Sequence, residues 1–220
     1  MTPEEILKGL FDETLVGNGP AVLDLTNQGL ELGMGPETLL FEALIPSLEE
    51  VGARFERGDF FVPEMLIAGK AMSGALDVLR PLLAQTGAET VGKFVMGTVK
   101  GDVHDIGKNL VNIMLEGAGF EVIDLGVQVA PETFVEAIGE HAPDIVGFSA
   151  FLTTTMPMFK ANINALEKAG LRDQVIVMVG GAPVTQEYAD AVGADGYAAD
   201  ASTAVRRAKE LLDQRRLVSA

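Results

Sequence analysis

The stretch KFVMGTVKGDVHDIGKNLV, residues 93–111, decides the fold of this chain. An apolar run of strand length, Lys93–Thr98, leads into a glycine-bracketed loop, and a helical pattern follows at residues 106–118. This alternation recurs four times toward the C-terminus. Strands are expected at Glu121–Leu125, Ile145–Ser149, Val175–Val179 and, more weakly, Gly196–Ala198, and helices at 131–141, 156–169, 184–192 and 201–215. Five such units predict an α/β domain over residues 91–220, in which helices cover both faces of a parallel sheet.

Residues 1–88 show helical patterns only. Thr2, Pro3 and two glutamates predict a helix start, and that helix runs to about Val16. Further helices are expected from Pro20 to about Leu32, from Pro36 to about residue 57, and from about Val62 to Leu83. Four helices with short connections predict a small bundle. The polar residues 84–90, AQTGAET, are interpreted as a linker between the two domains.

Composition excludes several classes of site. The chain has no cysteine, which excludes disulfides, thiolate zinc sites and iron–sulfur clusters, and it has only two histidines. The formal charge of −16, from 32 acidic and 16 basic residues, argues against binding of nucleic acid. It indicates an acidic surface, either simply solvated or suited to docking on basic partners. No long uninterrupted apolar run and no basic leader are seen, so we expect a cytoplasmic protein that does not span a membrane.

The loop after the first strand carries the chemistry. Ligands of parallel sheets bind beyond the carboxyl ends of the strands, so the loops of interest are 97–107, 126–130, 149–155 and 180–183. His104 lies in the first of them, and either Asp102 or Asp105 could bind the far nitrogen of a metal-ligating imidazole. The alternative is an ordinary surface or capping histidine. A lone histidine cannot hold an aquated metal ion tightly, so a metal at His104 would have to arrive in a macrocycle, either a haem or a corrinoid.

The segment GTVKGDVHDIGKNLV, residues 97–111, resembles the cobalamin-binding signature of methionine synthases, cobalamin-dependent mutases and corrinoid proteins of methyltransferase systems. Three later segments match in order: Asp124–Val127, the loop from Gly147 to Thr155 with Phe151 where leucine is commoner, and Gly180–Pro183. The segment GARFERGDFFVPEMLIAGKAM, which ends at Met72, resembles the helical cap that precedes the corrinoid domain. The resemblance is strongest to the two-domain corrinoid proteins that serve methanol, methylamine, betaine or aryl-ether methyltransferases. It implies a four-helix-bundle cap followed by a flavodoxin/Rossmann-like corrinoid domain.

The resemblance also implies roles for individual residues. His104 would ligate cobalt in place of the cofactor's own base, and Asp102 would bind the far imidazole nitrogen, with Thr153 or Thr155 extending the relay. The nucleotide tail would lie between the first and fourth strands, where Ser149 would bond its base. The residues implied to bind the cofactor, together with the two below, are Gly101, Asp102, Val103, His104, Asp105, Ile106, Gly107, Ser149, Phe151, Thr153, Thr155, Gly180 and Gly181.

In the cap, Phe61 and Met65 would cover the upper face of the corrin. The alternative is that they are simply part of the bundle core. A cap has to move aside for each partner, so the linker at 84–90 is the expected hinge.

The implied function is that of a methyl carrier. A substrate-specific methyltransferase would load a methyl group onto Co(I), and a second would pass it to tetrahydrofolate or a thiol, with a reductive activase as a third partner. Whether such a subunit counts as an enzyme stays open. The alternatives are a cobalamin-dependent sensor, a detached mutase subunit, and a flavin or dinucleotide protein. The last is disfavoured because residues 97–107 lack G-x-G-x-x-G.

Overall fold

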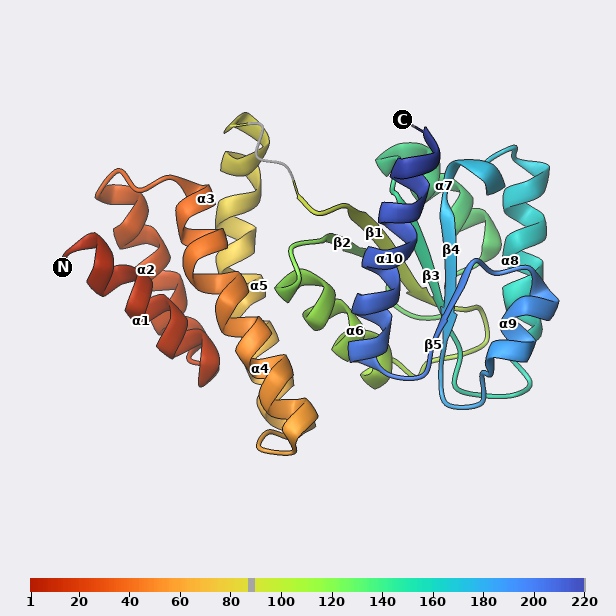
Figure 1. The fold of residues 1–220 in the computed structure, drawn as a ribbon, viewed down its shortest axis with the longest axis horizontal. Helices are drawn as coiled ribbons and strands as arrows, with labels where there is room; N and C mark the ends of the chain where they lie inside the picture. The colour runs from red at the N-terminus through yellow and green to blue at the C-terminus, as the bar shows by residue number, and fades with distance from the viewer. Residues whose placement is uncertain (87–89, 220) are drawn as a thin grey trace. The chain divides into compact units, whose positions relative to one another are not determined.

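The computed structural model describes residues 1–86 and 90–219 of the chain. The chain divides into two compact units. A helical unit comprises Met1–Thr90 and Glu116–Gly119, and an α/β unit comprises Val91–Leu115 and Phe120–Ala220. The helical unit is drawn from red to yellow in Figure 1 and the α/β unit from green to blue.

The helical unit is built from antiparallel helical segments. Its elements are α1 (Pro3–Leu15), α2 (Gly19–Glu31), α3 (Pro36–Leu39), η1 (Leu40–Leu44), α4 (Ile45–Arg57) and α5 (Val62–Thr86). The expected start of α1 is confirmed by a capping box, in which the Thr2 hydroxyl accepts from the Glu5 amide and the Glu5 carboxylate accepts from the Thr2 amide.

The third expected helix contains an irregular turn. Leu40–Leu44 is π-helical, and the Ile45 amide donates to the carbonyl of Leu40, five residues earlier. Pro46 follows directly and has no amide hydrogen to donate to the preceding turn. The wider turn therefore lets one helical path continue through a proline that would otherwise break it.

The linker prediction is wrong at its start. α5 continues to Thr86, three residues beyond the expected end at Leu83. Residues 84–86 include no helix breaker, and the first glycine comes at position 87. The rest of the expected linker, residues 87–89, lies outside the described residues.

The α/β unit confirms the predicted alternation. Its strands are β1 (Lys93–Thr98), β2 (Glu121–Asp124), β3 (Ile145–Ser149), β4 (Ile176–Gly180) and β5 (Gly196–Ala198). Its helices are α6 (Ile106–Gly117), α7 (Pro131–His141), α8 (Pro157–Lys168), the 3-10 turn η2 (Arg172–Gln174), α9 (Gln186–Val192) and α10 (Ala201–Ser219). No helix within the described ranges combines the length and apolar character needed to cross a membrane.

All five strands are parallel, in the order β2-β1-β3-β4-β5. The order reverses between β1 and β3, because the chain moves outward to β2 and then returns past β1. The expectation of a groove between the first and fourth strands needs correction, since β3 lies between them. The carboxyl ends of β1 and β3 define the switch point instead.

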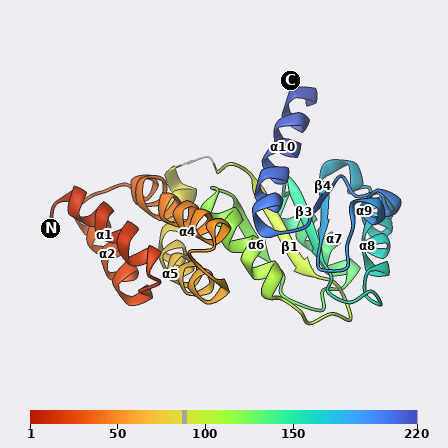
Figure 2. The same ribbon diagram turned by 60° about the horizontal axis from the view of Figure 1, so that its bottom comes forward.

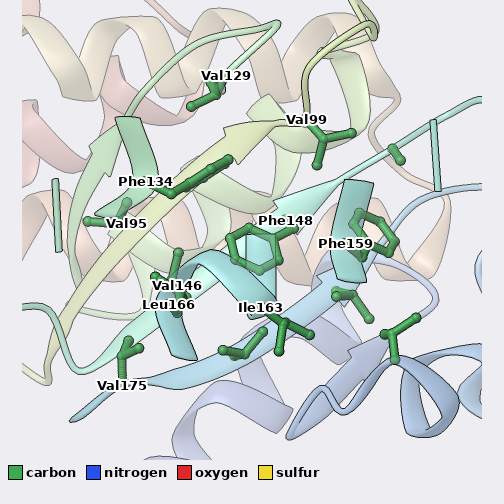
Figure 3. Packing of buried hydrophobic residues seen from close by; sticks show 14 of the residues in the cluster. Val95, Val99, Val129, Phe134, Val146, Phe148, Phe159, Ile163, Leu166 and Val175 are labelled. Carbon is green, nitrogen blue, oxygen red and sulfur yellow. The ribbon is translucent and has the colours of Figure 1, made fainter. Parts of the chain in front are cut away.

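The helices cover the sheet unequally. α6 and α10 lie on one side, and α7, α8 and α9 lie on the other, as two views of the ribbon show (Figures 1 and 2). The side facing α7–α9 holds a continuous apolar core. There the Phe148 ring lies edge-on to Phe134, with ring centroids 4.7 Å apart, and near Phe159 (Figure 3). This core fixes the sheet on which the loops at the carboxyl edge are mounted.

Candidate functional site

The last rung of the sheet on the α6/α10 side is made of small residues. Thr98, Ser149, Gly180 and Ala198 are aligned across β1, β3, β4 and β5. Side chains alternate along a strand, so this row points away from the core that contains Phe148. A row without bulky side chains at the switch point leaves room for a ligand.

Asp102 is the buried anchor of the loop that follows β1. Its Oδ1 accepts from the His104 amide at 3.0 Å and lies 2.7 Å from His104 Nδ1. Its Oδ2 accepts from the amides of Phe151 and Leu152, at 2.8 and 3.2 Å, and from the Thr155 hydroxyl at 2.7 Å. The carboxylate is completely buried, and donors from two loops surround it.

These donors keep Asp102 ionised. Burial alone would raise the pKa of Asp102, but hydrogen bonds from the Thr155 hydroxyl, the His104 amide and imidazole, and the Phe151 amide outweigh it. The pKa of Asp102 therefore lies well below its ordinary value.

The imidazole of His104 presents one nitrogen outward. An ionised carboxylate only accepts hydrogen bonds, so Nδ1 next to Asp102 carries the proton, and Nε2 of the neutral ring keeps a lone pair. The His104 side chain is 45% exposed. Its ring stacks on Phe151 with centroids 4.4 Å apart and planes inclined by 26°.

The structure separates the alternatives left open by the sequence. Of the two candidate aspartates, Asp102 contacts the imidazole. Of the two candidate threonines, Thr155 is buried against Asp102, whereas Thr153 is exposed. The Thr155 hydroxyl has a second acceptor, the Leu152 carbonyl, at 2.8 Å.

Backbone bonds brace the histidine loop. The Asp102 amide donates to the Val99 carbonyl and the Gln128 amide donates to the Asp102 carbonyl, both at 3.1 Å. The Thr98 hydroxyl donates to the His104 carbonyl, also at 3.1 Å. The loop is thus tied to the end of β1 and to the loop after β2.

Exposed apolar side chains surround the histidine in sequence and on the facing loop. Val103, Ile106, Phe151 and Leu152 are 58, 63, 51 and 39% exposed. The loop after β1 and the loop after β3, which carry these side chains or lead into them, meet at the Asp102 carboxylate. They form a surface suited to a large, flat, largely apolar ligand.

The predicted glycines differ in what they do. A side chain at Gly181 (φ +136°) would meet the Ala150 carbonyl oxygen at 1.9 Å, so only glycine fits there. Gly101 also has a positive φ of 86°. At Gly107 an added Cβ would have no heavy atom within 4 Å, so this glycine keeps space open beside α6.

The sequence prediction missed two polar residues on the buried side of α6. Lys108 is buried, and its ammonium binds Asp124 and, at 2.8 Å, the amide oxygen of Asn109. Asn112, one turn later, is 8% exposed, and its Oδ1 has no hydrogen-bond partner among the described residues. Polar residues four apart on a stripe that continues to the buried Leu115 are the signal that could have revealed them.

The predicted cap residues differ in exposure. Phe61 is 66% exposed and Met65 is fully buried. The Phe61 amide donates to Glu64 at 2.9 Å, at the start of α5.

Known families match both units. A model described as a B12 binding domain matches residues 92–206, and a second with the same description matches residues 6–80. Dimethylamine corrinoid protein 1 of Methanosarcina acetivorans is 43% identical over 96% of this chain and 100% of its own length. The chain belongs to the B12-binding corrinoid protein family.

Two further corrinoid proteins are similar to this chain along most of its length. Trimethylamine corrinoid protein 2 of Methanosarcina mazei is 41% identical over 92% of this chain and 91% of its own length. A chain in the crystal structure of the methanol:cobalamin methyltransferase complex MtaBC from Methanosarcina barkeri matches with a TM-score of 0.83 and 27% identity. That match covers 96% of this chain and 80% of the other.

The cofactor of this corrinoid protein is cobalamin or a related corrinoid, and its residues fit such a group. Within residues 1–86 and 90–219, no cluster of three or more His, Asp or Glu side chains could hold a bare metal ion. A single outward imidazole nitrogen suits a metal whose other donors come from a ring. The unpartnered Asn112 oxygen and the open space at Gly107 suit a ligand with polar and bulky parts.

Proposed function

We propose that this corrinoid protein carries methyl groups between two methyltransferases. The observation that supports the proposal is the outward Nε2 of His104, held by the buried, ionised Asp102 at the switch point of a B12-binding domain. The relatives named above, dimethylamine and trimethylamine corrinoid proteins, make methylamine systems the first to test.

When bound, the corrinoid supplies a cobalt centre that accepts a methyl group as a Co(I) nucleophile and later releases it. His104 Nε2 would ligate the cobalt. Asp102 would fix the tautomer that leaves this lone pair free.

The Thr155 hydroxyl can change its hydrogen-bond direction when a proton is added to the His104–Asp102 pair. Its hydroxyl has one hydrogen and two acceptors, Asp102 Oδ2 and the Leu152 carbonyl. With its hydrogen on the carbonyl, the Thr155 oxygen can accept from a protonated Asp102 instead. A proton can therefore reside on the His104–Asp102 pair as the ligand bond loosens, without leaving a buried group unpaired.

The nucleotide tail is proposed to lie between α6 and the row of small residues on the sheet. Gly107 leaves space for it, Gly180 would line the site without a side chain, Gly181 fixes the turn after β4, and Ser149 would bond its base. Asn112 joins this set, because its buried oxygen lacks a donor that a ligand can supply.

We assign residues 91–220 as the corrinoid domain and residues 1–88 as the cap, with Phe61 as the exposed cap residue. Met65 is buried, as the core alternative requires, so its proposed contribution is to support Phe61 from within. On the corrinoid domain, Val103, Ile106, Phe151 and Leu152 would lie under the ring.

The proposed partners are three enzymes. The chain has no cysteine, and its described residues offer no metal cluster with which to activate a methyl donor. A substrate-specific methyltransferase would therefore load the methyl group, and a second would transfer it to tetrahydrofolate or a thiol. A reductive activase would restore cofactor that has become oxidised.

The ligand assignment is tested by reconstitution with hydroxocobalamin and reduction to Co(II). Electron paramagnetic resonance of 15N-labelled protein should show 15N hyperfine splitting in the wild type and in His141→Ala, which removes the chain's other histidine, whereas the cofactor's own unlabelled base gives a 14N pattern. His104→Ala should retain the corrinoid more weakly and lose the protein-derived nitrogen splitting. An unchanged spectrum in His104→Ala would rule out the assignment.

The carrier role is tested with purified methyltransferases of methylamine, methanol and aryl-ether systems. The loaded, reduced chain should change its corrinoid absorption only when the enzyme and its methylated substrate are both present. No change with any methylamine, methanol or aryl-ether methyltransferase would exclude the carrier role while leaving corrinoid binding intact.

A further inference from the structure

The stack between His104 and Phe151 has no assigned role in the relay. The two rings come from different loops, with centroids 4.4 Å apart and planes 26° from parallel. Both side chains are about half exposed, so burial in a core does not force the rings together. A specific contact between exposed rings is therefore a feature to explain.

Asp102 by itself does not aim the imidazole. Its Oδ1 anchors Nδ1, but the two ring nitrogens are separated by one carbon and do not lie opposite each other. The ring turns about the His104 Cα–Cβ and Cβ–Cγ bonds, and the single contact at Nδ1 restricts this motion without fixing the plane of the ring. A contact on the face of the ring restricts it further, and Phe151 provides one.

The same carboxylate holds both rings in place. Oδ1 binds the imidazole of His104, and Oδ2 accepts from the backbone amide of Phe151 at 2.8 Å. The Leu152 amide and the Thr155 hydroxyl bind Oδ2 as well, so the loop that carries Phe151 is fixed at three points. The Asp102 carboxylate thus holds the backbone of Phe151 as well as the imidazole of His104.

We propose that Phe151 is a positioning residue for metal ligation, because its stacked ring fixes the plane of the His104 imidazole and so the direction of Nε2. The inference rests on the proposed function, in which Nε2 ligates cobalt. It gives Phe151 an effect through His104, beyond any apolar contact that its exposed ring makes with the corrin. A leucine at this position would keep the apolar contact and lose the ring stack.

The stack is first tested in the chain without cofactor. Proton resonances of the His104 ring should be shifted upfield by the ring current of Phe151 in the wild type. The shift should vanish in Phe151→Leu and persist in Leu152→Ala, which alters the neighbouring side chain of the same loop. Identical His104 resonances in wild type and Phe151→Leu would overturn the inference.

The route of the effect is tested by a double-mutant cycle in hydroxocobalamin affinity. Phe151→Leu should weaken binding roughly 2- to 10-fold in the wild-type background, as expected for loss of one aromatic stack. In the His104→Ala background the same change should have an effect under about 2-fold. Leu152→Ala, which removes apolar contact only, should have equal effects in both backgrounds.

Nitrogen splitting on Co(II) gives a second measure. Phe151→Leu and Phe151→Ala should show an altered splitting, or a fraction of cobalt without it, whereas Thr154→Ala, an exposed change in the same loop, should match the wild type. Equal effects of Phe151→Leu in both backgrounds, with wild-type splitting, would overturn this inference alone. A wild type that never shows nitrogen splitting would overturn the proposed function, and this inference with it.

Discussion

The two faces of the sheet use the same five strands in opposite ways. Toward α7, α8 and α9, the strands contribute Val95, Val146, Phe148 and Val177 to a closed apolar core (Figure 3). Toward α6 and α10, the last rung consists of threonine, serine, glycine and alanine. The next rung on that side includes Gly147, where an added Cβ would meet Met96 Sδ at 2.6 Å.

The buried polar groups on the two sides also differ in their setting. Asn112 lies on α6, one turn from the buried Lys108, and its side-chain oxygen has no hydrogen-bond partner in the part of the chain that the structure describes. Asn162 on α8 is fully buried beside Phe159, Ile163 and Leu166 of the same helix, and neither of its side-chain polar atoms has a hydrogen-bond partner among the described residues. The comparison teaches that a continuous apolar core closes the α7–α9 face, whereas the α6/α10 face carries small residues at its carboxyl edge, where we propose that the ligand binds. Substitutions on each face can test this.

The largest expected effect is on the closed face. Phe148→Ala should lower the free energy of unfolding by about 3–5 kcal/mol, because it leaves a cavity between Phe134 and Phe159. Urea denaturation of the cofactor-free chain measures this. The variant should still bind hydroxocobalamin at temperatures where it is folded. A loss of binding without loss of stability would contradict the division between the faces.

Next is Asp102→Asn, at the edge shared by both faces. The folded pKa of Asp102 lies below that of an unfolded aspartate, so the folded chain binds fewer protons in that range. The stabilisation is therefore complete above the unfolded value, about pH 4, and is lost as pH falls through the folded pKa. The variant should be less stable by roughly 2–3 kcal/mol at neutral pH.

The difference in the free energy of unfolding between wild type and Asp102→Asn should become smaller as the pH is lowered below about 4. Urea denaturation of both proteins at pH 7, 5 and 3 measures this difference. Asp105→Asn, three residues after Asp102, is the control and should change the free energy of unfolding by less than about 0.5 kcal/mol. A gap that stays constant down to pH 3 would show that the carboxylate charge is not what stabilises the loop.

A smaller effect of opposite sign is expected at Asn162. Asn162→Leu should raise the free energy of unfolding by about 1–2 kcal/mol, since it removes two unpaired polar atoms from an apolar site. Thermal unfolding measures the gain, and corrinoid affinity should not change. Asn112→Leu on the other face should weaken hydroxocobalamin binding. Equal effects of the two changes on binding would remove the distinction between the faces.

The smallest change compares two helical glycines. An added Cβ meets no atom within 4 Å at either Gly107 in α6 or Gly139 in α7. Alanine at each should raise the stability of the cofactor-free chain by about 0.5–1 kcal/mol. Only Gly107→Ala should weaken hydroxocobalamin binding, by about tenfold, because its methyl group occupies the space kept for the ligand. A tight complex with Gly107→Ala would place the ligand elsewhere.

Most of the fold could be predicted from local patterns. Apolar runs such as Lys93–Thr98 and the helical spacing after them specify the strand–helix alternation, and the structure confirms the parallel sheet. The neighbours of each strand could not be derived in this way. Whether β3 lies between β1 and β4 depends on the path of the crossover helices, which periodicity does not encode. The π-turn at Leu40–Leu44 was missed because the apolar residues keep helical spacing through Pro46, so the pattern predicted one regular helix.

The candidate site divides in the same way. Asp102 and Asp105 both lie within two residues of His104, so spacing left both as candidates, and the contact with Asp102 was expected only from the family resemblance. Thr155 lies far along the chain in a run of three threonines, and only the turn in which its amide bonds the Leu152 carbonyl selects it. Asn112 gave no family signal, and its significance depends on burial without a partner.

The division of donors around Asp102 has a consequence for reversibility. Oδ1 serves His104 alone, whereas Oδ2 is bound by Phe151, Leu152 and Thr155 from the other loop. If the imidazole moves away, the buried anion keeps four hydrogen bonds, from the His104, Phe151 and Leu152 amides and the Thr155 hydroxyl. The imidazole can therefore leave Asp102 and return to it, because the carboxylate stays ionised and hydrogen-bonded in the same place while the ring is away.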